Sequence, residues 1–249
     1  MTRGKHLGTG ASAVIELLPS GRVTKTPIPN PFCRAEEEDH RQNMRIEARV
    51  YQALGEHACL PKMYDWEPDT CRLTLEYMEN GDIGEYVREH RDEISPEIRL
   101  RWAIQAAEGV SVVHSAGVLH CDISPRNFLL DSKLNLRISD FGGASLDGAE
   151  PTAEPGERFR PGSFDWRSPP TTKDDLFGLG SLIYFIATNT YPYEEIPSDE
   201  VVKLYEVRQF PNVEDLVCGS VIQQCWLGEA DSAKLVHSKL RTLEATQAQ

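Results

Sequence analysis

The sequence is short of basic residues. Its 249 residues include 26 lysines and arginines against 39 aspartates and glutamates, which gives a formal net charge of −13. Because nucleic acid backbones are polyanions, this balance argues against free nucleic acid as a partner. The acidity is compatible with a neutral or basic protein partner, and equally with a role in solubility alone.

Paired cysteines are also absent. The six cysteines are scattered along the chain, and no Cys-x-x-Cys pair occurs. Structural zinc sites and disulfide frameworks usually show such pairs or a regular spacing, so the pattern argues against both. A reducing, intracellular setting is therefore the expectation.

Long apolar runs are missing as well. The most apolar stretch, Leu176 to Ala187, is too short to span a bilayer and predicts a buried helix. The opening residues MTRGKHLGTG carry charge with no apolar run behind them, so no secretory signal is expected. We therefore expect a cytoplasmic or nuclear protein with no membrane partner. For its assembly we expect a monomer.

A strand-rich region comes first. RVTKTPI, residues 22–28, follows a Pro-Ser-Gly turn and is rich in β-formers, while residues 61–78 predict two strands around a turn. Between them, Ile46, Val50 and Leu54 recur at helical spacing, which predicts one helix with one buried stripe. The first third should therefore combine a sheet with one main helix.

The remainder is mainly helical. Residues 95–117 have a Ser-Pro-Glu start, a long apolar stripe and a glycine near the end, as helices do. Two short strand-like pieces follow within 127–142. Residues 142–172 are rich in Gly, Pro, Ser and Thr and predict a long loop, a feature that is usually functional or disordered. An apolar helix at 176–188 and two or more further helices complete the chain, and the change from strands to helices should lie near 79–81.

Three motifs occur in order on this framework: LGTGASAVI at 7–15, LHCDISPRNFLL at 119–130 and ISDFGGAS at 138–145. The first alone could be a plain β-turn. Together the motifs resemble the catalytic domain of eukaryotic protein kinases, from Leu7 to about Arg241. The resemblance implies an α+β, two-lobed fold with a small β-rich N-lobe carrying one main helix and a larger, mainly α C-lobe. The implied limits are an N-lobe of about 1–78, a hinge of about 76–81 and a C-lobe of about 82–249, within a single domain, 1–249.

The resemblance also implies ATP as a cofactor. Glycines in the first motif let backbone amides approach phosphate oxygens, although Ala13 stands where a third glycine is usual. Lys25 would pair with the α- and β-phosphates, and Glu47 on the predicted helix would hold it. The segment after the second predicted strand could equally be an ordinary edge strand and turn. The implied nucleotide-binding residues are Gly8, Gly10, Ile15, Val23, Lys25, Leu75, Glu76, Met78, Asp82 and Leu129.

The second and third motifs carry the implied chemistry. Asp122 would accept or orient the proton of the substrate hydroxyl. Asn127 and Asp140 would bind Mg²⁺, because oxygen ligands beside phosphates suit a hard cation. Asp175, on the apolar helix, would brace the catalytic loop from below. The implied catalytic set is Asp122, Lys25, Glu47 and Arg126.

The catalytic loop departs from the family pattern. Cys121 replaces an arginine that can bind phosphate on the activation loop, and a thiol makes no bidentate phosphate contact. Activity is therefore expected not to depend on phosphorylation there. Ser124 replaces the lysine of Ser/Thr kinases, but Arg126 stands where tyrosine kinases carry an arginine and should compensate. Pro170 replaces a glutamate whose usual arginine partner is missing too, so no buried charge is left unpaired.

The resemblance implies transfer of the γ-phosphate of MgATP to Ser or Thr hydroxyls of a protein substrate. Ser163, at the usual threonine position of GSFDWRSPP, favours Ser/Thr over Tyr. The altered catalytic loop keeps a second interpretation open, a pseudokinase that binds ATP or a partner as a scaffold without efficient catalysis. A small-molecule phosphotransferase of the aminoglycoside or choline kinase type shares Asp-x-x-x-x-Asn, but Asp-Phe-Gly and the helix around Asp175 argue against it.

Overall fold

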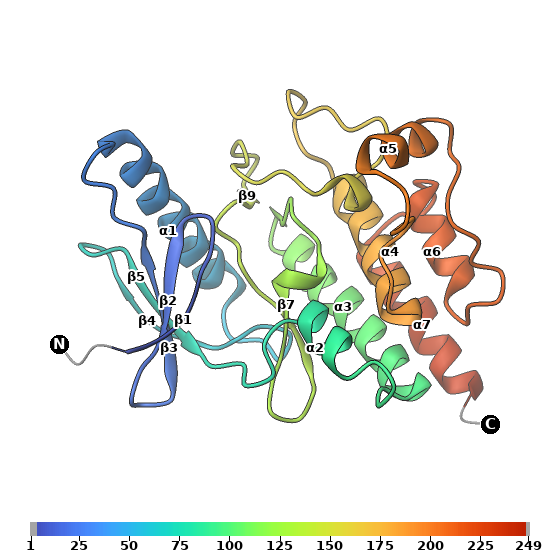
Figure 1. Ribbon diagram of the computed structural model, residues 1–249, viewed down its shortest axis with the longest axis horizontal. Coiled ribbons are helices and arrows are strands. Elements are labelled where there is room, and N and C mark those ends of the chain that lie inside the picture. Colours follow the sequence, from blue (N-terminus) through green and yellow to red (C-terminus); the bar gives the residue numbers. More distant parts are fainter. Residues whose placement is uncertain (1–3, 248–249) are drawn as a thin grey trace.

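The five-stranded sheet lies at one end of the molecule and most of the helices at the other (Figure 1). The computed structural model describes residues 4–247, so residues 1–3 and 248–249 of the predicted single domain lie outside the described residues. The first region holds β1 (Lys5–Thr9), β2 (Ala13–Leu17), β3 (Arg22–Pro27), α1 (Arg34–Leu54), β4 (Met63–Glu67) and β5 (Arg72–Glu76). This order confirms a sheet with one main helix in the first third.

The antiparallel sheet has the strand order β1-β2-β3-β5-β4, so β3 is its central strand. Val23 and Thr24 of β3 are both buried, as expected for β-branched residues in the middle of a sheet. The next residue, Lys25, lies opposite Ile15 on β2 and Leu73 on β5. The sheet therefore holds the lysine backbone from both sides, next to the turn between β1 and β2.

Helix α1 forms where the sequence predicts it, but the predicted buried stripe is only partly right. Val50 is fully buried, whereas Ile46 and Leu54 are half-buried and pack at the margin of the core. The most buried face includes Glu47, at 1% exposure, and Tyr51, at 2%. A hydrophobic pattern cannot predict a buried glutamate, because this burial depends on an ion pair with a distant strand.

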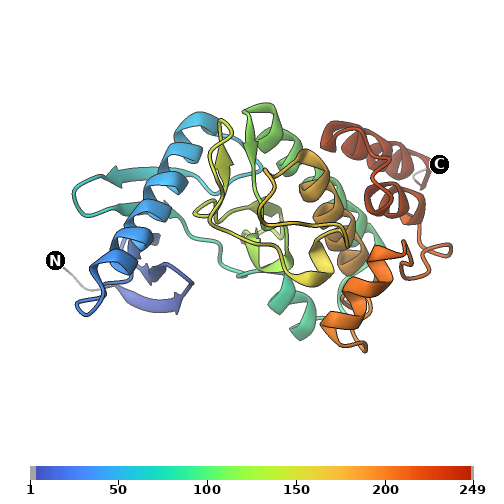
Figure 2. The same ribbon diagram turned by 90° about the horizontal axis from the view of Figure 1, so that it is seen from above.

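The larger region contains the remaining elements: α2 (Ile83–Glu89), α3 (Pro96–Ser115), β6 (Val118–Leu119), β7 (Phe128–Leu130), β8 (Leu136–Ile138), β9 (Ser145–Leu146), α4 (Thr172–Thr188), α5 (Ser198–Glu206), α6 (Gly219–Trp226) and α7 (Ala233–Gln247). Seen from above, these helices gather at the end away from the sheet (Figure 2). The predicted hinge at 76–81 lies in the connection between β5 and α2. A mixed α+β fold with a β-rich first part and a helical second part confirms the predicted fold class.

Two helices of this region begin at capping residues, of which the sequence predicts the first. The Ser95 side chain accepts a hydrogen bond from Ile98 N at the start of α3. Thr171 and Asp174 form a capping box at the start of α4, so this helix begins before the apolar run that predicts it. Both helices pack in the core, and among the described residues no helix is long and apolar enough to cross a membrane.

Residues 142–172 are mostly irregular, as predicted. They contain β9 and a single 3₁₀ turn, Glu157–Phe159, before α4 begins. Strand β9 pairs with β6, which precedes the catalytic motif. The sequence does not predict these two strands, because two-residue strands are too short to show a periodic pattern.

Candidate active site

A buried lysine lies between two carboxylates where the sheet, α1 and the turn after β8 meet. Lys25 Nζ is 2.6 Å from Glu47 Oε2 and 2.7 Å from Asp140 Oδ1. The pair of Lys25 with Glu47 that the sequence predicts is therefore formed. Burial alone would lower the pKa of Lys25, but the charges of Asp140 and Glu47 outweigh it and raise the pKa. The lysine stays charged, and its charge in turn lowers the pKa of Asp140.

Asp122 lies in the loop before β7, with one carboxylate oxygen held and the other free. Its Oδ2 accepts hydrogen bonds from Arg126 Nη2 at 2.8 Å and from Asn127 Nδ2 at 2.9 Å. Asn127 Nδ2 also donates to the backbone oxygen of Asp122 at 2.7 Å. Within residues 4–247, the buried Oδ1 has no hydrogen-bond partner. The carboxylate is thus fixed in orientation through Oδ2, at the edge of the cavity described below.

Asp175 of α4 braces this loop from beneath, as the sequence predicts. Its two oxygens accept the backbone N–H groups of His120, at 2.8 Å, and Cys121, at 2.9 Å. His114 Nε2, from the last turn of α3, lies 2.9 Å from the same carboxylate. No sequence motif includes His114, and its position at the end of a helix is the only signal that could indicate it.

His120 connects the loop of Asp122 to that of Asp140. Its Nε2 lies 2.9 Å from Ser139 O, and Asp122 N donates to its Nδ1 at 3.3 Å. Since Nδ1 accepts a hydrogen bond, Nε2 is the ring nitrogen that donates to Ser139 O. Phe141, next to Asp140, packs against the His120 ring with centroids 5.3 Å apart. The two loops therefore form one hydrogen-bonded and packed unit.

Cys121 does not have the surroundings of a reactive thiol. It is 7% exposed, and burial raises its pKa to about 12, so it is a neutral thiol near pH 7. Its backbone adopts a left-handed conformation with φ of 64°, and Asp140 does so with φ of 65°. Such conformations cost roughly 1–3 kcal/mol each and persist where surrounding bonds hold them. The Cys121 backbone is held by its N–H, which donates to Asp175 Oδ1, and the Asp140 backbone is held by the contact of its carboxylate with Lys25.

The charged side chains of the site face a shared cavity of about 280 Å³. Its lining includes Lys25, Asp122, Arg126, Asp140 and the turn between β1 and β2. That turn leaves room for a ligand, because a Cβ built on Gly8 would meet nothing within 4 Å and one on Gly10 only a carbonyl oxygen at 3.8 Å. The phosphate-end residues predicted from the sequence are thus brought together around one space.

The residues predicted to meet the base and ribose lie along β2, β3, β5 and the following connection. Val23, Leu75 and Met78 are buried. Asp82 pairs with Leu129 in an isolated β-bridge, which brings these two predicted residues together. Several of their polar groups are already bonded within the protein. The Asp82 carboxylate caps α2, Met78 O accepts from Gly81 N, and the Glu76 carboxylate accepts from Lys62 N.

The segment before α4 surrounds a second hollow of about 580 Å³. Ser163, Trp166 and Ser168 line it and are exposed. Cys121 lines the same hollow, at the position where the family pattern has arginine. The side chain that would anchor a phosphate there is therefore replaced by a short, neutral one.

The site combines a charged lysine that Glu47 fixes, an open glycine turn and the carboxylates of Asp122 and Asp140. This combination suits the phosphates of a nucleotide. The family model described as "Protein kinase domain" matches residues 1–226. This chain belongs to the protein kinase domain family.

Curated relatives include both tyrosine and serine/threonine kinases. The receptor tyrosine-protein kinase erbB-4 of Homo sapiens is 27% identical over 251 residues, covering 93% of this chain and 19% of that protein. The receptor tyrosine-protein kinase erbB-2 of Mesocricetus auratus is 26% identical over 246 residues, covering 91% of this chain and 19% of that protein. A probable serine/threonine-protein kinase of Dictyostelium discoideum is 27% identical over 172 residues, covering 64% and 18%. The chain spans about a fifth of the length of these relatives.

Proposed function

We propose that this chain is an active protein kinase that transfers the γ-phosphoryl group of MgATP to Ser or Thr hydroxyls of a protein substrate. The observation that carries the proposal is the arrangement around the cavity. Lys25 is bonded to Glu47 and Asp140, and Asp122 has one bonded and one free carboxylate oxygen. Phosphoryl transfer requires an oriented carboxylate facing the same cavity as a charged lysine, and this arrangement therefore favours catalysis over the pseudokinase alternative.

The residues present fit MgATP. We assign the α- and β-phosphates to Lys25 and to the backbone of the glycine turn, which is open to a ligand. Asp140 and Asn127 would bind Mg²⁺ through oxygen atoms. The proposed base and ribose contacts come from Ile15, Val23, Leu75, Glu76, Met78, Asp82 and Leu129. Bound MgATP supplies the phosphoryl group and the metal charge that neutralises it.

The chain's own part in the reaction is positioning and proton acceptance. The Asp122 carboxylate would accept the proton of the attacking hydroxyl, while Arg126 and Asn127 hold its orientation. Lys25 keeps its charge because both carboxylates raise its pKa, so it can neutralise phosphate throughout the physiological pH range. We also propose that the hinge lies at about 76–81, between an N-lobe of about 1–78 and a C-lobe of about 82–249.

A tyrosine acceptor is the second candidate. Arg126 stands where tyrosine kinases carry an arginine, and its Nη2 lies 2.8 Å from Asp122 Oδ2. Receptor tyrosine kinases among the curated relatives point the same way. The Ser/Thr proposal rests on Ser163 at the usual threonine position.

A peptide library with equal numbers of Ser, Thr and Tyr acceptors tests the acceptor class. The chain is incubated with γ-labelled MgATP, and the labelled amino acid is identified after hydrolysis. We expect label on Ser and Thr. Label confined to Tyr would replace the proposal with the tyrosine kinase alternative, and nucleotide binding without any label would support the pseudokinase.

Arg126→Ala is expected to lower kcat by roughly 10²-fold with little change in KM for ATP, because the positive charge beside Asp122 acts mainly on the transferring group. Arg126→Lys should restore part of the loss, since it keeps the charge but not the planar fork. Steady-state kinetics with the preferred peptide measure both. Arg241→Ala, an exposed arginine on α7, is the matched control. A kcat for Arg126→Ala equal to that of this control would contradict the compensating role.

Phosphatase treatment is expected to leave the activity unchanged, because Cys121 supplies no charged anchor for a phosphate in the hollow before α4. The chain is assayed before and after treatment, with mass spectrometry to verify dephosphorylation. Activity that disappears on treatment and returns on rephosphorylation would contradict this prediction.

A further inference from the structure

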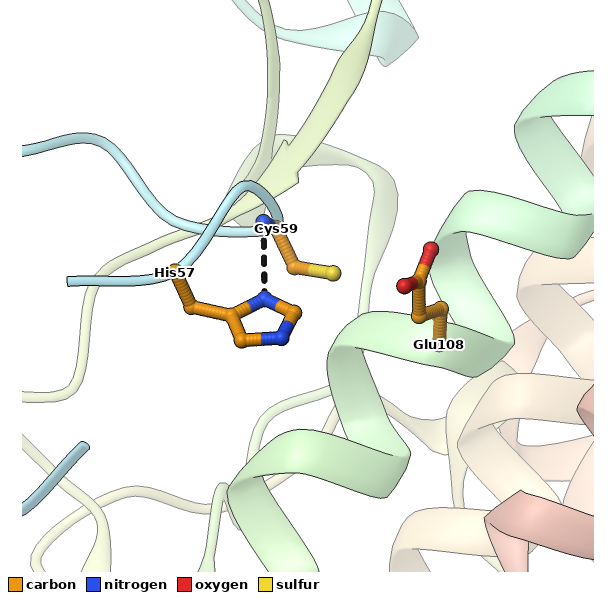
Figure 3. Close-up of side chains that lie close together, drawn as sticks. All are labelled: His57, Cys59 and Glu108. Carbon is orange, nitrogen blue, oxygen red and sulfur yellow. Dashed lines mark hydrogen bonds between the residues drawn. The ribbon is translucent and has the colours of Figure 1, made fainter. Parts of the chain in front are cut away.

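A second cluster of chemically active side chains lies where the loop after α1 meets α3. The loop between α1 and β4 carries His57 and Cys59, and α3 carries Glu108. One ligand atom of each residue lies within 4.8 Å of the other two. Figure 3 shows the imidazole, thiol and carboxylate converging from the loop and the helix. None of the three lines the cavity around Lys25 and Asp122.

The loop that presents His57 and Cys59 is held in place by its backbone. Ile138 N donates to Cys59 O at 2.9 Å, and Arg137 Nη1 donates to Leu60 O at 3.1 Å. Leu60 N closes a turn by donating to His57 O at 3.1 Å. The two side chains therefore project from a fixed turn, as a preorganised pair of ligands requires.

The approach of the loop to α3 depends on Gly109. A Cβ at this position would lie 3.0 Å from Ile138 Cγ2 and 3.8 Å from Cys59 Cβ. The missing side chain lets β8 and the loop pack closely on the helix, next to Glu108. This close packing brings the carboxylate to the thiol, although the two residues are far apart in the sequence.

Glu108 forms no ion pair within the described residues, and the guanidinium of the nearby Arg137 is bonded to Leu60 O and Asp131 instead. Cys59 is 4% exposed, Glu108 is half-buried and His57 is exposed. One side of the cluster is therefore open to an entering ion, while the thiol and carboxylate face each other on the inner side.

We propose that His57, Cys59 and Glu108 form a binding site for a borderline divalent transition-metal ion, with Zn²⁺ as the expected ion. Sulfur, imidazole nitrogen and carboxylate oxygen are the three ligand types that zinc takes, whereas Mg²⁺ prefers oxygen ligands alone. Three protein ligands leave a fourth tetrahedral position for water, on the exposed side beside His57. A shift of about 1 Å in the side chains brings the ligand atoms to zinc-binding distances.

Binding is balanced by the release of a proton. Cys59 is buried at 4% exposure, so the unbound residue is a thiol near pH 7. The ion displaces the thiol proton and forms a metal–sulfur bond, and the proton leaves to solvent. His57 Nδ1 accepts a hydrogen bond from Cys59 N at 3.2 Å. On metal binding, the ion would replace this N–H as the partner of the imidazole nitrogen.

The sequence argues against zinc because it contains no Cys-x-x-Cys pair, and the proposed site uses a different pattern. His57 and Cys59 are separated by one residue, while Glu108 comes from the middle of a helix. Bound metal would connect the end of α1 to α3, and so connect the strand-rich region to the helical one. The proposal is independent of phosphate transfer, and its test contains no nucleotide.

Titration of the whole chain, freed of metal with a chelator, tests the site. Co²⁺ serves as the spectroscopic probe, because a thiolate ligand produces a sulfur-to-cobalt charge-transfer band, and Zn²⁺ serves as its competitor. We expect one ion per chain, loss of the band when Zn²⁺ is added, one proton released per ion in weak buffer near pH 7, and a Tm that rises with Zn²⁺ concentration.

Variants locate the ion. Cys59→Ser should abolish the band, and Glu108→Gln should weaken binding at least about tenfold. Cys218→Ser, at a buried cysteine outside the cluster, is the matched control and should bind as the wild type does. Because Cys59 is buried and its variant could unfold, Glu108→Gln at a half-buried position is the decisive variant. Absence of the band in the wild type, or equal binding by Glu108→Gln and Cys218→Ser, would overturn the proposal.

Discussion

Asp122→Asn is expected to lower kcat by roughly 10³-fold while ATP affinity stays close to that of the wild type. The amide keeps the shape of the carboxylate, and its oxygen can still accept from Arg126 and Asn127. It cannot take a proton from the attacking hydroxyl. Single-turnover transfer to the preferred peptide measures the loss of chemistry, and titration with a fluorescent ATP analogue measures affinity.

Asp231→Asn, at an exposed aspartate near the start of α7, is the control for Asp122→Asn and should behave as the wild type. Equal losses of ATP affinity and of turnover in Asp122→Asn would mean that this residue holds the nucleotide or the fold. That result would contradict its role as proton acceptor.

Asp175→Ala is expected to lower the free energy of unfolding by about 3–5 kcal/mol. Asp175 is 3% exposed and accepts bonds from two backbone amides and from His114. Its removal leaves buried donors without an acceptor and releases the left-handed backbone at Cys121. Urea unfolding followed by circular dichroism measures the change. Asp175→Asn should lower the free energy of unfolding by less, because its amide oxygen can still accept a hydrogen bond.

Asp199→Ala provides the comparison for Asp175→Ala. Its carboxylate is 75% exposed and lies 3.4 Å from Lys203, so its loss should change the unfolding free energy by no more than about 0.5 kcal/mol. If Asp175→Ala lay within the same range, the proposed brace beneath the catalytic loop would be wrong.

The parts of the site that could be predicted from the sequence are those that short, local motifs indicate. The spacing of Asp122 and Asn127 along one loop brings them into direct contact, at 2.7 Å and 2.9 Å. The resemblance to protein kinases predicts Lys25 and Glu47 as a pair, with the lysine on a strand and the carboxylate on the following helix, and their contact is formed. The strands around residues 61–78, the capped helix from Ser95 and the loop at 142–172 follow from equally local signals.

The parts that could not be predicted depend on long-range packing. The buried face of α1 includes Glu47, because Lys25 compensates the charge of this glutamate. The apolar spacing of Ile46, Val50 and Leu54 therefore predicts only part of the buried face. His114 meets Asp175 across two helices. The cluster of His57, Cys59 and Glu108 forms only when a loop packs beside Gly109 on α3, and no spacing along the chain indicates it.

The central claim is that the arrangement around Lys25 and Asp122 catalyses phosphoryl transfer. Its most direct measurement is transfer of labelled γ-phosphate from MgATP to peptide by the purified wild-type chain, with Asp122→Asn measured in parallel at saturating nucleotide. We predict labelled peptide from the wild type and none above background from the variant, with both binding ATP. Nucleotide binding by the wild type without any transfer would contradict the account and identify Cys121 and Ser124 as the substitutions that matter most.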